Sequence, residues 1–142
     1  MQHFIHTTKE QGQQFYLDYH QKGKVVMLNL LRFKDNADYT DFPDLDPGEE
    51  ITGKAAYNLY MHHTRPRIDE VGSKVLFFGK SNSFLIGPTA EQWDAVLLVE
   101  HPSVEKFMAF AQNEAYLKTA GHRTAALADS RLLPITEIGV RD

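Results

Sequence analysis

Apolar and polar positions divide this chain into helical and extended segments that alternate along its length. Thr7 and Glu10 have the spacing of a capping box, which marks the start of a helix, and Gly23 is a plausible end. This pattern predicts a leading helix over residues 8–22. Residues 24–33 are apolar at almost every position, with almost no alternation. A strand of this kind is typically covered on both faces, so we expect it at the centre of a sheet.

Residues 34–50 carry seven acidic side chains, two prolines and a glycine, and we interpret them as an inserted acidic loop. Pro134 cannot donate to a sheet ladder, which favours an edge position for the last strand. The remaining predicted elements are helix 52–71, strands 74–80, 83–86 and 93–100, helices 103–112, 114–120 and 122–128, and a last strand 131–138.

After the leading helix, the main elements run strand, helix, two strands, helix, strand. This is the order of a ferredoxin-like split βαβ sandwich, an α+β fold whose four-stranded antiparallel sheet carries helices on one face only. We therefore expect one domain over residues 1–142, in which the leading helix 8–22 and the acidic loop 34–50 are additions.

The sequence also indicates that both faces of this sheet are covered. The first strand is apolar on both sides, with Val25 and Met27 on one and Leu28 and Leu30 on the other. Each buried Leu or Val contributes about 1.5–3 kcal/mol, so a wet apolar face is unfavourable. We expect a second copy to stack on that face as an isologous homodimer. The alternative is that the leading helix folds across it.

Composition and charge narrow the classes of function. The chain has no cysteine, which excludes disulfides, thiolate metal sites and a cysteine nucleophile. A net charge of −4 disfavours nucleic acid as a partner. No apolar run approaches the ~20 residues of a membrane helix, and the first residues lack the pattern of a signal peptide. We expect a cytoplasmic protein without membrane contact.

Several short segments of the chain carry a resemblance to a known family: GSKVLFF at 72–78, IG at 86–87, VLLVEHPS at 96–103, EAY at 114–116 and the following Arg123. With these segments, the chain from Tyr57 to the last strand resembles the dimeric α/β-barrel domains known as domain of unknown function 1330. The resemblance implies the ferredoxin-like fold and a homodimeric barrel formed by two sheets. Proteins with the same barrel include cofactor-free antibiotic-biosynthesis monooxygenases, haem-degrading enzymes and muconolactone-isomerase-like proteins, and the fold does not select among them.

Two polar residues of the first strand are candidates for ligand contact. Asn29 is an amide within an apolar strand, and it serves either a structural hydrogen bond or a ligand. It is similar to the asparagine with which barrel monooxygenases hold a substrate carbonyl. Arg32 ends the strand, where it would meet an anionic ligand or, as we favour, pair with Glu100.

The helical half of the chain offers further candidates. His101 sits at the corner before a helix and His122 near the end of the chain, and either is a candidate for moving a proton near neutral pH. The alternative for His101 is a surface residue at this corner with no role in chemistry. Arg123 is suited to bind a carboxylate bidentately, as we favour, or to form an ion pair with an acidic residue at the edge of the dimer.

Tyr57 and Tyr60 are expected mainly in the core, and the alternative is that their hydroxyls reach the cleft. Tyr116, in the helix segment that resembles the family, joins Tyr60 among the substrate-binding candidates.

The histidines do not predict a metal site. His62 and His63 are adjacent on a helix and point about 100° apart, so they do not converge on one ion. Asn29, Trp93 and His122 are the residue types of haem-degrading relatives. However, in those proteins the tryptophan precedes the histidine on one helix, whereas Trp93 opens a predicted strand. Haem is therefore a minor alternative, and we expect no cofactor.

These observations predict a dimeric barrel whose interior cleft binds a small, mostly apolar molecule with a carbonyl or carboxylate group. Catalysis would be cofactor-independent oxygenation or isomerisation. The alternative is a non-catalytic domain that binds a ligand or only assembles.

Overall fold

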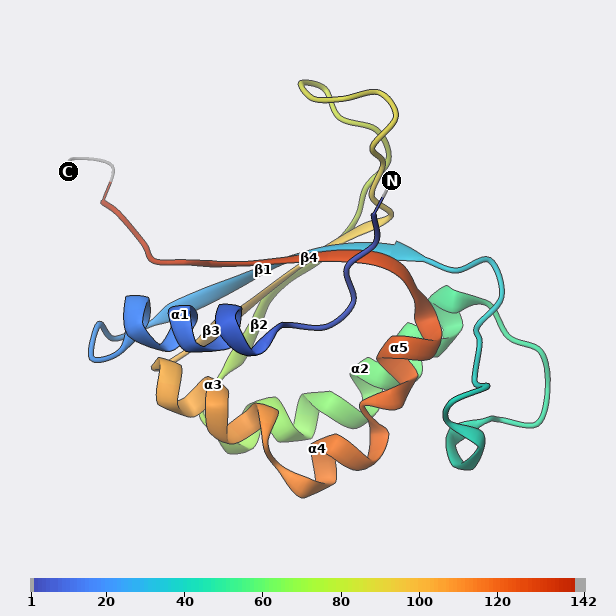
Figure 1. Ribbon diagram of the computed structural model, residues 1–142, viewed down its shortest axis with the longest axis horizontal. Helices are drawn as coiled ribbons and strands as arrows, with labels where there is room; N and C mark the ends of the chain where they lie inside the picture. Colours follow the sequence, from blue (N-terminus) through green and yellow to red (C-terminus); the bar gives the residue numbers. More distant parts are fainter. Residues whose placement is uncertain (1, 140–142) are drawn as a thin grey trace.

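A computed structural model describes residues 2–139 and contains one four-stranded sheet (Figure 1). Every neighbouring pair is antiparallel, and the strand order is β2-β3-β1-β4. This order and the interposed helices are those of the ferredoxin-like fold, which confirms the predicted α+β class. The strands are β1 (Val25–Phe33), β2 (Lys74–Lys80), β3 (Ala95–His101) and β4 (Leu127–Ile135).

All helices lie on one side of the sheet (Figure 1). Thr8, Thr52, Ser103 and Asn113 cap four of them, each accepting a hydrogen bond from a backbone N–H of the first turn. The helices are α1 (Lys9–Tyr19), α2 (Gly53–Glu70), α3 (Val104–Ala111), α4 (Glu114–Thr119) and α5 (Gly121–Ala126), and the 3-10 turn η1 is Pro43–Leu45.

The leading helix does not cover the open face of the sheet. In α1, Phe15 packs edge-on against Phe107 of α3, and the Tyr19 hydroxyl donates to the Pro134 carbonyl of β4. Figure 1 shows α1 on the same side of the sheet as α3. The helix begins one residue later than predicted, since the cap is Thr8 rather than Thr7, and it ends at Tyr19.

Two strand predictions were wrong in position. The last strand begins at Leu127 rather than residue 131 and ends at Ile135, because α5 is short and leads directly into β4. Residues 83–86 form no strand beyond one isolated bridge between Ser83 and Gln92, since this segment rises away from the sheet and has no neighbouring strand. The edge position of Pro134 is confirmed, because β4 pairs only with β1.

The acidic segment 34–50 is a loop, as predicted, but it is docked on the helices. Tyr39 is buried in it, the Ala37 amide donates to Ile51 and the Asp38 amide donates to Ala125. These bonds fix the loop against the start of α2 and the end of α5.

The sheet face opposite the helices, here called the open face, carries a row of apolar side chains. Val26, Leu28 and Leu30 of β1 alternate there with the buried helix-side residues, and Phe77 and Leu133 flank them on β2 and β4. No described segment of the chain covers them (Figure 1). Within residues 2–139 no helix is long and apolar enough to cross a membrane.

Candidate functional site

Tyrosines from two helices meet on the helix-covered side of the sheet. The hydroxyls of Tyr60 on α2 and Tyr116 on α4 are 2.8 Å apart, and the Tyr57 ring packs 5.2 Å from the Tyr60 ring. Arg123 of α5 is close enough that its charge acts on both Tyr57 and Tyr60. With Asn29 of β1, which faces the same side of the sheet, these residues form what we call the interior group.

The Asn29 amide is oriented by the backbone around it. Its Nδ2 group donates to the carbonyls of Met27 at 3.3 Å and Leu97 at 3.2 Å, which uses both amide hydrogens and assigns the remaining atom as oxygen. Oδ1 accepts no hydrogen bond from the described residues. The asparagine therefore offers an acceptor, which suits a ligand hydroxyl or N–H rather than the carbonyl expected from the sequence.

Packing is incomplete around Asn29. Its helix-side neighbours along β1, Met27 and Leu31, are buried, whereas Asn29 is only half-buried. Across the ladder, Leu132 of β4 faces the same side and is 46% exposed. The sheet–helix interface is therefore accessible from the β4 edge at the level of this amide.

Tyr57 supplies a second free polar atom. Its side chain is buried, yet its hydroxyl forms no hydrogen bond with the described residues. Burial raises the pKa of Tyr57 and, well above the ordinary value, that of Tyr60, while the positive charge of Arg123 acts in the opposite direction on both. Both phenols therefore stay protonated at neutral pH and can donate.

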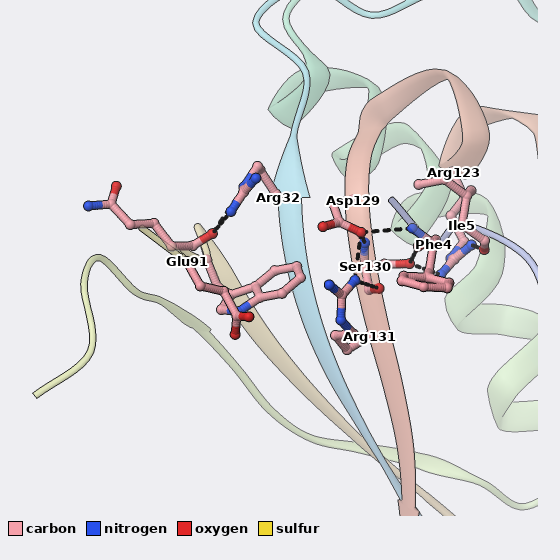
Figure 2. Close-up of polar contacts among 10 residues, drawn as sticks. Phe4, Ile5, Arg32, Glu91, Arg123, Asp129, Ser130 and Arg131 are labelled. Carbon is pink, nitrogen blue, oxygen red and sulfur yellow. Dashed lines mark hydrogen bonds and ion pairs between the residues drawn. The ribbon is translucent and has the colours of Figure 1, made fainter. Parts of the chain in front are cut away.

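Arg123 is partly committed to structural bonds. One guanidinium nitrogen donates to the Ile5 carbonyl at 2.6 Å and the other to the Ser130 hydroxyl at 3.3 Å (Figure 2). These bonds hold the segment before α1 beside β4. The ion pair to an acidic residue that the sequence left as an alternative is not formed among the described residues.

Arg32 lies apart from the interior group. It follows Leu30 along the open face, donates through Nε and one terminal nitrogen to the Gln92 carbonyl, and stacks over Trp93 (Figure 2). The expected pairing with Glu100 was wrong, because the antiparallel register sets Leu31 opposite Ala95 and Val26 opposite Glu100. Glu100 instead pairs with Lys24 and Lys74.

An ionic cluster beside Arg32 had no signal in the sequence. Asp129 is fully buried, and its Oδ1 accepts from the Phe4 amide, the Ser130 amide and the Arg131 guanidinium (Figure 2). Although burial raises the pKa of Asp129, these hydrogen bonds outweigh it and lower that pKa. Arg131 also lies over the Trp93 ring. The cluster ties the start of the chain to β4.

His101 is a buried histidine rather than a surface corner. Its Nδ1 lies 2.6 Å from the Ser73 hydroxyl, and Phe107 and Phe110 pack against the ring. Burial lowers its pKa from 6.5 to about 4, so it is neutral at neutral pH. Four residues separate it from Asn29 in register, or roughly 13 Å along the sheet.

The buried neutral His101 predicts acid-sensitive stability. Between pH 6.5 and about 4 the unfolded chain binds a proton at this residue and the folded chain does not. The contribution of neutral His101 to the free energy of unfolding is therefore fully present above pH 6.5. The free energy of unfolding falls by roughly 3 kcal/mol as the pH drops to about 4. Urea unfolding at several pH values measures the slope. His101→Asn should flatten it, whereas the exposed control His6→Asn should not; an unchanged slope in His101→Asn would contradict the assignment.

His122 is buried and belongs to another polar group, formed with Tyr39 of the acidic loop and His63 of α2. Its Nδ1 lies 2.6 Å from the Tyr39 hydroxyl, and its ring stacks on that of His63. Burial and the proximity of His63 lower its pKa. A catalytic role for His101 or His122 stays a prediction, since the structure brings neither histidine into the interior group.

Of the residues predicted from sequence, the structure thus brings Tyr60, Tyr116 and Arg123 together, with Asn29 facing the same side. Tyr57 was assigned mainly to the core, and its helical spacing from Tyr60 was the signal available for it. The Asp129–Arg131 pair depends on β4 beginning at Leu127, which the sequence pattern did not show.

Comparisons with known proteins agree with this architecture. RPA0582, a protein of unknown function from Rhodopseudomonas palustris, is 35% identical. The crystal structure of its methylated form has a TM-score of 0.87 with 100% of each chain covered, and a second structure has a TM-score of 0.85 with 97% of this chain and 99% of that chain covered. A Caulobacter crescentus protein provisionally assigned as an antibiotic biosynthesis monooxygenase shares the fold alone, with 9% identity, a TM-score of 0.54 and coverage of 89% and 99%.

No curated protein matches the chain. The model of the family described as "Domain of unknown function (DUF1330)" matches residues 48–135. This range holds α2, the whole of β2 to β4 and four of the five members of the interior group, so the chain belongs to the DUF1330 family.

Proposed function

We propose that this protein is a homodimer that binds a small, mostly apolar molecule carrying a hydroxyl group beneath its sheet. The observation that carries the proposal is the free Oδ1 of Asn29. This acceptor is not among the buried atoms that lack a partner, so it is accessible and open to the donor group of a ligand or to water.

The helix-covered side of the sheet, which Asn29 faces, supports this class of ligand. On that side Tyr57 lies against Phe33 and Phe78, so aromatic side chains are present there, and the free Tyr57 hydroxyl is a further polar atom. Sites for small molecules are typically apolar with a few placed polar groups. Arg123 adds positive charge, which also accommodates a carboxylate on the ligand.

The same geometry favours binding over proton transfer. The interior group contains neither a carboxylate nor an imidazole, and the raised pKa values of Tyr57 and Tyr60 make both phenols poor bases. Oxygenation or isomerisation by general-base catalysis would need a further group. We therefore assign a binding role.

The homodimer is proposed from the open face. Its apolar row is bordered by charged residues, with Glu100, Lys24 and Lys74 at one end and Arg32 and Arg131 at the other. An apolar centre with a polar rim is the usual anatomy of a protein interface. Stacking two open faces would bury the apolar row of both copies in one symmetric interface.

Binding can be tested with phenols and the corresponding aryl methyl ethers by isothermal titration calorimetry. We expect wild-type protein to bind the phenols about tenfold more tightly, because only they donate to Asn29 Oδ1. Asn29→Leu should abolish this preference, whereas Asn36→Leu, at an exposed position of the acidic loop, should keep it.

The outcomes separate the alternatives. No binding of either series would contradict the ligand proposal and favour a domain that only assembles. A preference that persists in Asn29→Leu would mean that another residue holds the hydroxyl. Thermal melting without ligand checks that the variants are folded.

A further inference from the structure

The connection between β2 and β3 forms a projecting arm, here residues 81–92. Figure 1 shows it rising from the end of these two strands on the side of the sheet opposite the helices. Its base is fixed by the Ser81 amide, which donates to Asp94, and by the Ser83–Gln92 bridge. Trp93, which follows it, is buried. The arm thus extends from the open face at a defined position.

The tip of the arm is apolar and uncovered. Leu85 is 99% exposed and Ile86 is 92% exposed. Phe84 folds back on the Gly87 backbone, so closely that a Cβ at Gly87 would lie 2.8 Å from the ring. The tip is therefore shaped by its own packing, yet its two aliphatic side chains touch little else in the chain. Uncovered apolar side chains next to one another mark an interaction surface.

The arm is long enough to pass a second sheet. Ile86 lies six residues beyond Lys80, and an extended chain spans about 3.3 Å per residue, so the tip reaches up to roughly 20 Å from the strand end. Face-to-face sheets pack about 10 Å apart. An arm on the open-face side would therefore reach past the plane of a stacked second sheet to the flank of that copy.

The charge of the arm favours a second copy over a membrane. Glu91 is its only charged residue. The cations at its base are Lys80, which precedes it, and Arg32, which donates to the Gln92 carbonyl. Binding to anionic lipid needs a cluster of basic residues, which the arm lacks. An uncharged apolar tip is compatible with a partner of the same net charge of −4.

From these observations we infer that the arm clasps the second copy of the chain, with Leu85 and Ile86 packing on the partner outside the stacked sheets. This inference rests on the proposed homodimer. Because a twofold dimer contains two arms, each substitution at the tip acts twice.

The dissociation constant of the dimer tests the clasp. Sedimentation equilibrium of the double variant Leu85→Asp/Ile86→Asp should show a dissociation constant at least ~100-fold higher than that of wild type. Leu117→Asp on α4 is the control, since Leu117 is also exposed but lies on the helix side, and it should leave the constant unchanged. The tip variants should keep the wild-type fold by circular dichroism, because no core residue changes.

Crosslinking can detect the clasp directly, because the chain has no native cysteine and a single introduced one can be labelled selectively. Ile86→Cys labelled with benzophenone maleimide should photocrosslink to a second chain, whereas labelled Leu117→Cys should not. A dimeric wild type with an unchanged constant in the double variant and no crosslink would overturn the clasp and leave the dimer intact. A monomeric wild type would instead overturn the dimer itself. Binding of the tip to neutral phosphatidylcholine vesicles, without an effect on dimerisation, would also overturn the clasp.

Discussion

The variant Leu98→Glu is expected to be a folded monomer at concentrations where the wild-type protein is dimeric. Leu98 lies at the centre of the open face, between Leu28 of β1 and Phe77 of β2. In the proposed stacked dimer the introduced carboxylate would be buried without a partner, and a buried unpaired charge is unfavourable by several kcal/mol. Twofold symmetry places two such charges in one interface, so the dissociation constant should rise more than ~1,000-fold.

The fold of a single copy should tolerate this change. Leu98 is only half-buried within one chain, and its neighbours Leu97 and Val99 point to the helix side. Light scattering after size exclusion gives the oligomeric state, and circular dichroism gives the fold. Leu117→Glu on α4 is the matched control and should stay dimeric. A Leu98→Glu protein that remains dimeric would mean that the open face is not the interface.

Gly53→Ala is expected to be the most destabilising small substitution in the helices. Gly53 begins α2 and donates its amide to the Lys34 carbonyl. A Cβ at this position would collide with that carbonyl and lie 2.6 Å from the Ala126 carbonyl, and both obstacles are backbone. The free energy of unfolding should fall by roughly 3 kcal/mol or more, because α2, α5 and the end of β1 would have to separate.

Gly12→Ala provides a control of opposite sign. Gly12 lies within α1, and a Cβ there meets nothing within 4 Å. Alanine is favoured over glycine inside a helix by about 1 kcal/mol, so this variant should be slightly more stable than wild type. Urea unfolding of both variants compares the two effects. If Gly53→Ala were as stable as Gly12→Ala, this would contradict the close packing of α2 against the backbone of Lys34 and Ala126.

Gly53 also connects the fold to the interior group. The junction fixes the start of α2, from which Tyr57 and Tyr60 extend one and two turns later. Tyr60 then meets Tyr116, and Arg123 follows on α5, whose last residue is Ala126. A shift of α2 should therefore disturb ligand binding as well as stability.

The sequence by itself determined the main elements and their order, but not the start of β4 or the absence of a strand at 83–86. A nearly continuous run of apolar residues predicted β1, the capping-box spacing predicted the leading helix, and the order of strands and helices led to the ferredoxin-like sheet. These features are local or depend on chain order alone, so they can be predicted without knowing any tertiary contact. Asn29 could also be identified as a candidate, because an amide side chain within an apolar strand is unusual in the sequence itself.

Only the tertiary structure decided which polar groups are engaged. It showed that the Asn29 amide hydrogens are used and its Oδ1 is free, that His101 is bound to Ser73, and that Arg32 and Glu100 lie at opposite ends of the sheet. Each of these facts depends on register or on a partner tens of residues away. Sequence periodicity carries neither, because it records which side of an element a residue takes and not what it meets there.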